Sequence, residues 1–106
     1  MRSIFLGCYD YNGVDNTETE TNIESLTVTY CLHRCRKNGF GLAAIRGGNK
    51  CGCSNKPIDP KTEIDKSECQ DNCTGQKNST GLCGGIGKWS IYVLTESSSP
   101  EPDTLS

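Results

Sequence analysis

Eight cysteines are the residues of this 106-residue chain whose type and spacing could do chemistry. Thiols at close spacing either bind zinc or form disulfides. Structural zinc sites prefer gaps of about two to four residues at both ends, whereas Cys51 and Cys53 are separated by one residue and His33 is the only histidine. An even number of cysteines in a short chain is typical of a disulfide framework in an oxidising compartment. We therefore expect four disulfides, no metal and no cofactor, in an extracellular or cell-surface protein.

The other polar residues do not form a catalytic group. The two carboxylates of a glycosidase must be held rigidly across a cleft, and a charged loop in so small a domain does not provide that. The glycines of residues 81–87 follow no strand and lack the Gly-Lys-Ser/Thr of a phosphate-binding loop. We expect the chain not to be an enzyme, and a solvated charge run at Asp59, Glu63, Asp65 and Glu68.

Aromatic side chains are the candidates for ligand binding. A small module that binds sugar usually offers an exposed ring to the apolar face of a pyranose, beside groups that hydrogen-bond the hydroxyls. Trp89, Ile91 and Val93 share one face of a predicted strand, and Ser90, Tyr92 and Leu94 share the other. Trp89 is therefore expected in the core, with an exposed platform as the alternative. Candidate binding residues are the rings of Tyr11, Tyr30 and Trp89 and the polar side chains of Asn12, Arg46 and Asn49.

Composition limits the architecture and the partners. The apolar share is 33%, cysteines included, which supports one small core. The net charge of -2, from 11 basic and 13 acidic residues, gives no electrostatic reason to expect a nucleic acid or an acidic membrane as partner. No stretch approaches the roughly 18 apolar residues of a membrane span, so we expect no direct membrane insertion. Residues 95–106 are rich in Ser, Thr and Pro, which predicts a linker or stalk after a folded domain of residues 1–94.

Periodicity predicts the elements that position these residues. Thr27 is the expected N-cap of a helix whose apolar stripe includes Val28 and Leu32 and which stops at Gly39. A hairpin is predicted for residues 42–46 and 50–53 around a Gly-Gly-Asn turn. Residues 4–9 and 89–94 are predicted as the first and last strands.

The helix and the hairpin narrow the disulfide pairing. Cysteines four apart on a helix stack about 6 Å apart along its axis, and cysteines two apart on a strand lie about 6.6 Å apart on one face. Two parallel bridges can therefore link the predicted helix to the hairpin. For the other four cysteines we prefer one local and one long-range bridge. The predicted pairs are Cys31–Cys51, Cys35–Cys53, Cys73–Cys83 and Cys8–Cys69.

The cysteine and glycine pattern resembles that of the WSC domain, a small cysteine-rich module of fungal and animal cell surfaces. The resemblance covers residues 5–94 and implies an α+β fold of the PAN/apple type, with an antiparallel sheet cradling one main helix and the same disulfide pairing. The motifs that carry it are Leu6-Gly7-Cys8-Tyr9, Thr27-x-x-x-Cys31-x-x-x-Cys35, Cys51-x-Cys53, Cys69-x-x-x-Cys73-x-Gly75, Cys83-Gly84-Gly85 and Ser90-Ile91-Tyr92.

The resemblance also implies a function. Family members occur in cell-wall sensors, receptors and wall-associated proteins, and the module is regarded as a non-catalytic carbohydrate-binding domain for polysaccharides such as glucan or mannan. Many members have an aromatic residue between the Cys-x-Cys cysteines, whereas this chain has Gly52. That difference favours an alternative, in which the domain binds a protein or its own copies. Asn72 and Asn78 stand in sequons and are candidates for N-glycosylation.

Overall fold

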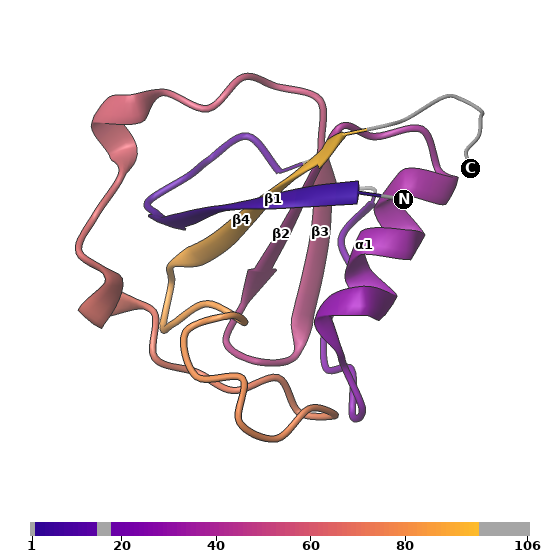
Figure 1. Cartoon of the computed structure of the whole chain (residues 1–106), viewed down its shortest axis with the longest axis vertical. Helices are drawn as coiled ribbons and strands as arrows, with labels where there is room; N and C mark the ends of the chain where they lie inside the picture. Colours follow the sequence, from indigo (N-terminus) through magenta and orange to yellow (C-terminus); the bar gives the residue numbers. More distant parts are fainter. Residues whose placement is uncertain (1, 15–17, 96–106) are drawn as a thin grey trace.

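The computed structural model describes residues 2–14 and 18–95, and it confirms the predicted α+β fold (Figure 1). Four strands form one antiparallel sheet in the order β1-β4-β2-β3, and a single α-helix packs against β2, β3 and β4. Two short 3-10 turns lie in the long connection between β3 and β4. The elements are β1 (Arg2–Tyr9), α1 (Val28–Lys37), β2 (Leu42–Arg46), β3 (Lys50–Ser54), η2 (Pro60–Thr62), η3 (Lys66–Glu68) and β4 (Trp89–Thr95).

Helix α1 begins where the sequence predicts it. The Thr27 hydroxyl accepts a hydrogen bond from the backbone N–H of Tyr30 at 3.0 Å, which satisfies one of the free donors of the first turn. The apolar stripe packs against the sheet, with Cys31, Leu32 and Cys35 buried and Val28 partly buried. Basic side chains gather in the last turn, where they complement the negative end of the helix dipole.

The strands extend slightly beyond their predicted bounds. β1 begins at Arg2, which pairs with Thr95 at the end of β4. Thr95, the first residue of the predicted linker or stalk, is thus the last residue of β4. The linker or stalk predicted for the rest of the C-terminal segment lies outside the described residues.

The β2–β3 turn requires glycine. Gly47 and Gly48 both have positive φ values, of 65° and 79°. A Cβ atom on Gly48 would lie 2.4 Å from the carbonyl oxygen of Asn72, so no other residue fits without movement. This turn fixes the register that places Arg46 opposite Lys50.

The sheet buries apolar residues on both faces. The face toward α1 carries the larger cluster, which includes Leu26, Ile45, Tyr92 and Leu94. The opposite face carries a smaller cluster of Tyr9, Tyr11, Ala44, Trp89 and Ile91. The predicted alternation along β4 is confirmed, because neighbouring residues of this strand belong to different clusters.

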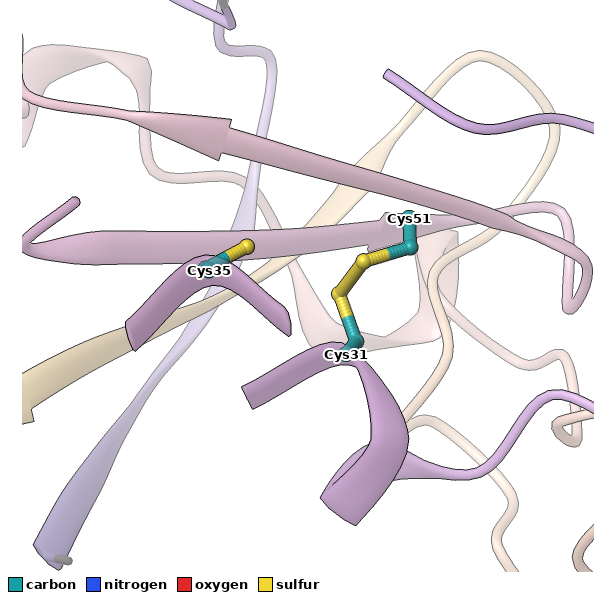
Figure 2. A group of neighbouring side chains, drawn as sticks. All are labelled: Cys31, Cys35 and Cys51. Atoms are coloured by element: carbon teal, nitrogen blue, oxygen red, sulfur yellow. A yellow bond between two sulfur atoms is a disulfide. The ribbon is translucent and has the colours of Figure 1, made fainter. Parts of the chain in front are cut away.

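All four predicted disulfides are present. Their Cα–Cα distances are 5.9, 5.6, 5.3 and 5.2 Å, for Cys8–Cys69, Cys31–Cys51, Cys35–Cys53 and Cys73–Cys83 in that order, within the usual range for a disulfide. Two of these bridges link α1 to β3. Figure 2 shows Cys31 bridged to Cys51, with Cys35 beside them one helical turn away. The sulfur atoms of these three residues lie within 4.8 Å of one another, but each belongs to a disulfide and is not a free thiolate.

The described residues include no helix that is long and apolar enough to cross a membrane. Helix α1 has 10 residues, about half of what a membrane span requires.

Candidate functional site

A row of three large side chains crosses the sheet on the face opposite α1. Trp89 of β4 lies directly opposite Arg46 of β2, and Arg46 lies directly opposite Lys50 of β3. Residues paired in this way project from the same face of an antiparallel sheet. The strand register therefore brings one aromatic ring and two cations together from three strands.

The ring of Trp89 is covered by these cations. The Arg46 guanidinium lies 4.8 Å from the ring centroid, and the Lys50 ammonium lies 5.8 Å from it. Both distances allow a cation–π interaction. Only 5% of Trp89 is exposed, so the expected core position is confirmed, and the ring does not offer a bare face to a neutral sugar.

Gly52 makes room for Val14 beside this indole ring. A Cβ atom built on Gly52 would lie 3.5 Å from two ring atoms of Trp89 and 2.5 Å from a methyl group of Val14. The position between the Cys-x-Cys cysteines is therefore covered by a tryptophan from another strand.

A cavity of about 190 Å³ lies beside this row. Its lining includes four of the six residues that the sequence nominated for binding, together with Val14, Thr19 and Lys50. The four nominated residues are Tyr11, Asn12, Arg46 and Trp89. The sequence missed Lys50, although the predicted hairpin already places it opposite Arg46.

The structure buries Tyr11, which the sequence nominated as a binding ring. Only 6% of this residue is exposed, and its hydroxyl lies 2.7 Å from the Ser54 hydroxyl and donates to the Lys56 carbonyl at 2.8 Å. The ring packs in the smaller core cluster because these polar partners, distant in the sequence, satisfy its hydroxyl. Tyr11 thus forms part of the cavity wall and is not an exposed platform.

Among the described residues, no carboxylate forms an ion pair with the two cations of the Trp89 row. Both ion pairs found within residues 2–14 and 18–95 involve Arg34, so neither Arg46 nor Lys50 pairs with a carboxylate there. Partial burial, and secondarily the positive charge of Arg46, lowers the pKa of Lys50 below its usual value. Two positive charges held close together over one ring favour the binding of an anion between or beside them.

Tyr30 forms a second, different surface on α1. It is 43% exposed, and its hydroxyl donates a 2.7 Å hydrogen bond to a Glu20 carboxylate oxygen. This hydrogen bond raises the pKa of the Tyr30 hydroxyl. The same carboxylate lies 3.4 Å from Nε of Arg34, one helical turn further along. A groove of about 390 Å³ runs here, lined by Tyr30, His33, Arg34, Lys37 and Asn38, and we name it the Tyr30 groove.

The other nominated residues lie apart from both surfaces. Asn49 is half-buried in the β2–β3 turn, and its carbonyl accepts a hydrogen bond from the Ile23 N–H at 2.9 Å. Both sequon asparagines are exposed, and the Asn72 side chain accepts a hydrogen bond from the Thr80 hydroxyl at 3.0 Å.

Two members of the acidic run are structural. Asp59 and Asp65 cap the two 3-10 turns, accepting hydrogen bonds from the N–H groups of Lys61 and Ser67 at 2.9 and 2.8 Å. The hydrogen bonds from Ser67 lower the pKa of the Asp65 carboxyl. These carboxylates therefore serve the backbone of the loop.

The fold and the four disulfides define a small cross-linked domain of an extracellular type. The sequence model of the WSC domain matches residues 5–85, and the chain belongs to this family, whose domains occur in receptors and wall proteins.

Named relatives include both animal and fungal proteins. The chain is 31% identical over 94 residues to Kremen protein 2 of Mus musculus, which covers 86% of the chain and 20% of that protein. It is 29% identical to a WSC domain-containing protein of Arthroderma benhamiae, over 94% of the chain and 11% of that protein. It is 28% identical to a putative fungistatic metabolite of Chaetomium globosum, over 99% of the chain and 46% of that protein. The chain thus spans less than half the length of each.

Proposed function

We propose that this domain is a non-catalytic carbohydrate-binding module of a secreted or surface-anchored protein, and that it holds a neutral polysaccharide such as a cell-wall glucan or mannan. The observation that carries the proposal is the exposed ring of Tyr30, which is held in place by its hydrogen bond to Glu20. A ring fixed in this way can meet the C–H face of a pyranose without a large loss of side-chain entropy.

The Tyr30 groove also offers groups for the sugar hydroxyls. His33 and Lys37 lie one turn apart on the same side of α1, and both are exposed. An imidazole and an ammonium beside an aromatic ring can hydrogen-bond hydroxyls while the ring contacts carbon. Because two disulfides link α1 to β3, these groups stand on a rigid element.

Retention on insoluble glucan and mannan tests the proposal. Tyr30→Ala should weaken retention about tenfold because the stacking surface is lost, whereas Tyr30→Phe keeps the ring and should bind within about twofold of the original chain. Thr29→Ala, at an exposed neighbouring helix position, is the matched control. Equal retention of Tyr30→Ala and the control would contradict the proposal, as would failure to bind any neutral glycan.

A second candidate function is protein interaction or self-association, and the edge of the sheet favours it. Ile4 and Phe5 are about half exposed on β1, which is an edge strand. Phe5 also lines an apolar groove of about 180 Å³ with Leu82. Exposed apolar residues on a strand edge favour pairing with another chain.

Sedimentation over a range of concentrations tests this alternative. Self-association should be lost in Phe5→Ser and kept in Thr29→Ser. A monomer at all concentrations would exclude pairing through copies of this domain.

A further inference from the structure

The face of the sheet opposite α1 carries Trp89, Arg46 and Lys50, and we call it the Trp89 face. It holds a second site whose chemistry differs from that of the Tyr30 groove. Arg46 and Lys50 come from adjacent strands in direct register, so their separation is set by the sheet and not by a flexible loop. Both are half-buried, and both lie over the one indole ring. The arrangement keeps two positive charges close together in a partly desolvated place.

No described carboxylate neutralises this pair. Arg34, by contrast, is neutralised by two glutamates, whose carboxylates lie 3.7 and 3.4 Å from its guanidinium. An anion that enters the cavity would relieve the repulsion between Arg46 and Lys50. Guanidinium also presents paired N–H groups that match a carboxylate or a sulfate.

The size of the cavity restricts what enters. Sites for drug-sized ligands measure about 300–1,000 Å³, whereas this cavity measures about 190 Å³ and accepts one group or one sugar residue. Its rim carries the exposed side chain of Asn12, which can hydrogen-bond a hydroxyl. Trp89 and Val14 also line the cavity, so a small apolar surface lies beside the cations. This mixture suits a charged sugar residue.

We propose that Arg46 and Lys50, supported by Trp89, form a subsite for the carboxylate or sulfate group of an acidic polysaccharide. The anion site stands on the geometry of these three residues alone. Its assignment to a glycan rests on the proposed function of the domain. The subsite lies on the face of the sheet opposite α1. A substitution can therefore abolish binding at the subsite without abolishing binding in the Tyr30 groove, and the reverse also holds.

Fluorescence titration tests the subsite directly, because Trp89 is the only tryptophan in the chain. The probes are trigalacturonate, a sulfated oligosaccharide, neutral maltotriose and sodium sulfate. We expect a saturable change with one or both acidic oligosaccharides, and affinity that falls as salt is added. Arg46→Gln and Lys50→Gln should each weaken that binding about tenfold or more, since a charge-assisted hydrogen bond is removed.

Controls separate the possible causes. Lys61→Gln removes one positive charge from the exposed η2 turn and should bind like the original chain. Tyr30→Ala should leave the fluorescence titration unchanged, and melting curves verify that each variant folds. Equal affinity for maltotriose, or no effect of either substitution in a folded protein, would overturn the subsite. If sulfate ion alone binds as tightly as the oligosaccharides, the assignment to a glycan fails, while retention on neutral glycans through Tyr30 still tests the proposed function separately.

Discussion

The two faces of the sheet use aromatic residues in opposite ways. On the helix face, disulfides fix α1 to β3, and the ring of Tyr30 projects from this rigid helix into solvent. On the other face, Trp89 is buried beneath two cations and is held by packing and strand register. A bare ring suits the C–H surface of a neutral sugar, whereas a ring covered by cations suits an anion.

One short segment contacts both surfaces. Glu20 pairs with Cys51 along the outer edge of β3, through hydrogen bonds of 2.8 and 2.9 Å. Its carboxylate binds Tyr30 and Arg34, while the preceding Thr19 lines the Trp89 cavity. Residues 19–20 therefore connect the two surfaces around one edge of the sheet.

Removing a helix disulfide should have the largest effect and should act on one face. In Cys35→Ala/Cys53→Ala we expect the free energy of unfolding to fall by about 3 kcal/mol, since the unfolded chain is no longer constrained. Urea unfolding gives this value. Retention on glucan should weaken as α1 loosens, while Trp89 fluorescence in the folded protein stays unchanged. An unaltered unfolding midpoint would contradict the view that this bridge stabilises the helix face.

Filling the space beneath Trp89 should disturb the other face. Gly52→Val places a side chain against Val14 and the indole ring, and we expect a destabilisation of about 1–3 kcal/mol with a shifted Trp89 emission maximum. Gly41→Ala is the matched control, because a Cβ atom there meets only Asn55 Oδ1, at 3.5 Å. Emission and stability equal to those of the control would show that Gly52 is not needed for the position of the ring.

High pH should destabilise the helix-face core through Tyr92. Its buried hydroxyl donates to the Leu82 carbonyl, and burial raises its pKa well above the usual value near 10. The folded state therefore holds this proton more tightly than the unfolded state, so the contribution to stability is complete below pH 10 and declines as pH rises above it.

The comparison with Tyr92→Phe isolates this contribution. At neutral pH the variant should lose about 1–3 kcal/mol of unfolding free energy, because the Leu82 carbonyl loses its partner. Above pH 10 the stability of the variant should fall less steeply than that of the original chain. Parallel pH profiles for the two proteins would contradict a buried, protonated Tyr92.

The spacing of residues along the chain predicted the disulfide framework well, because the bridges between α1 and β3 depend on the regular geometry of a helix and a strand. The matching spacings of the helix and the strand indicated two parallel bridges between them, and the predicted Cys31–Cys51 and Cys35–Cys53 pairs are confirmed. The burial of Tyr11 depends on Ser54, which is 43 residues away, and local patterns carry no signal for such a contact.

The Trp89 row was only partly accessible to sequence reasoning. The hairpin predicted around residues 47–49 implies that Arg46 faces Lys50, so Lys50 could have been nominated. The pairing of β2 with β4, which brings Trp89 beside them, joins strands far apart in the chain and needed the structure.

A nuclear magnetic resonance titration with a neutral glucan oligosaccharide tests the central claim most directly. Amide shifts of the ¹⁵N-labelled domain report which surface the sugar contacts. The account predicts saturable shifts at residues 30–37 of α1 and at Asn38, with the indole N–H of Trp89 unmoved. Saturable shifts at the Trp89 face with none on α1, or no shifts at any concentration, would contradict it.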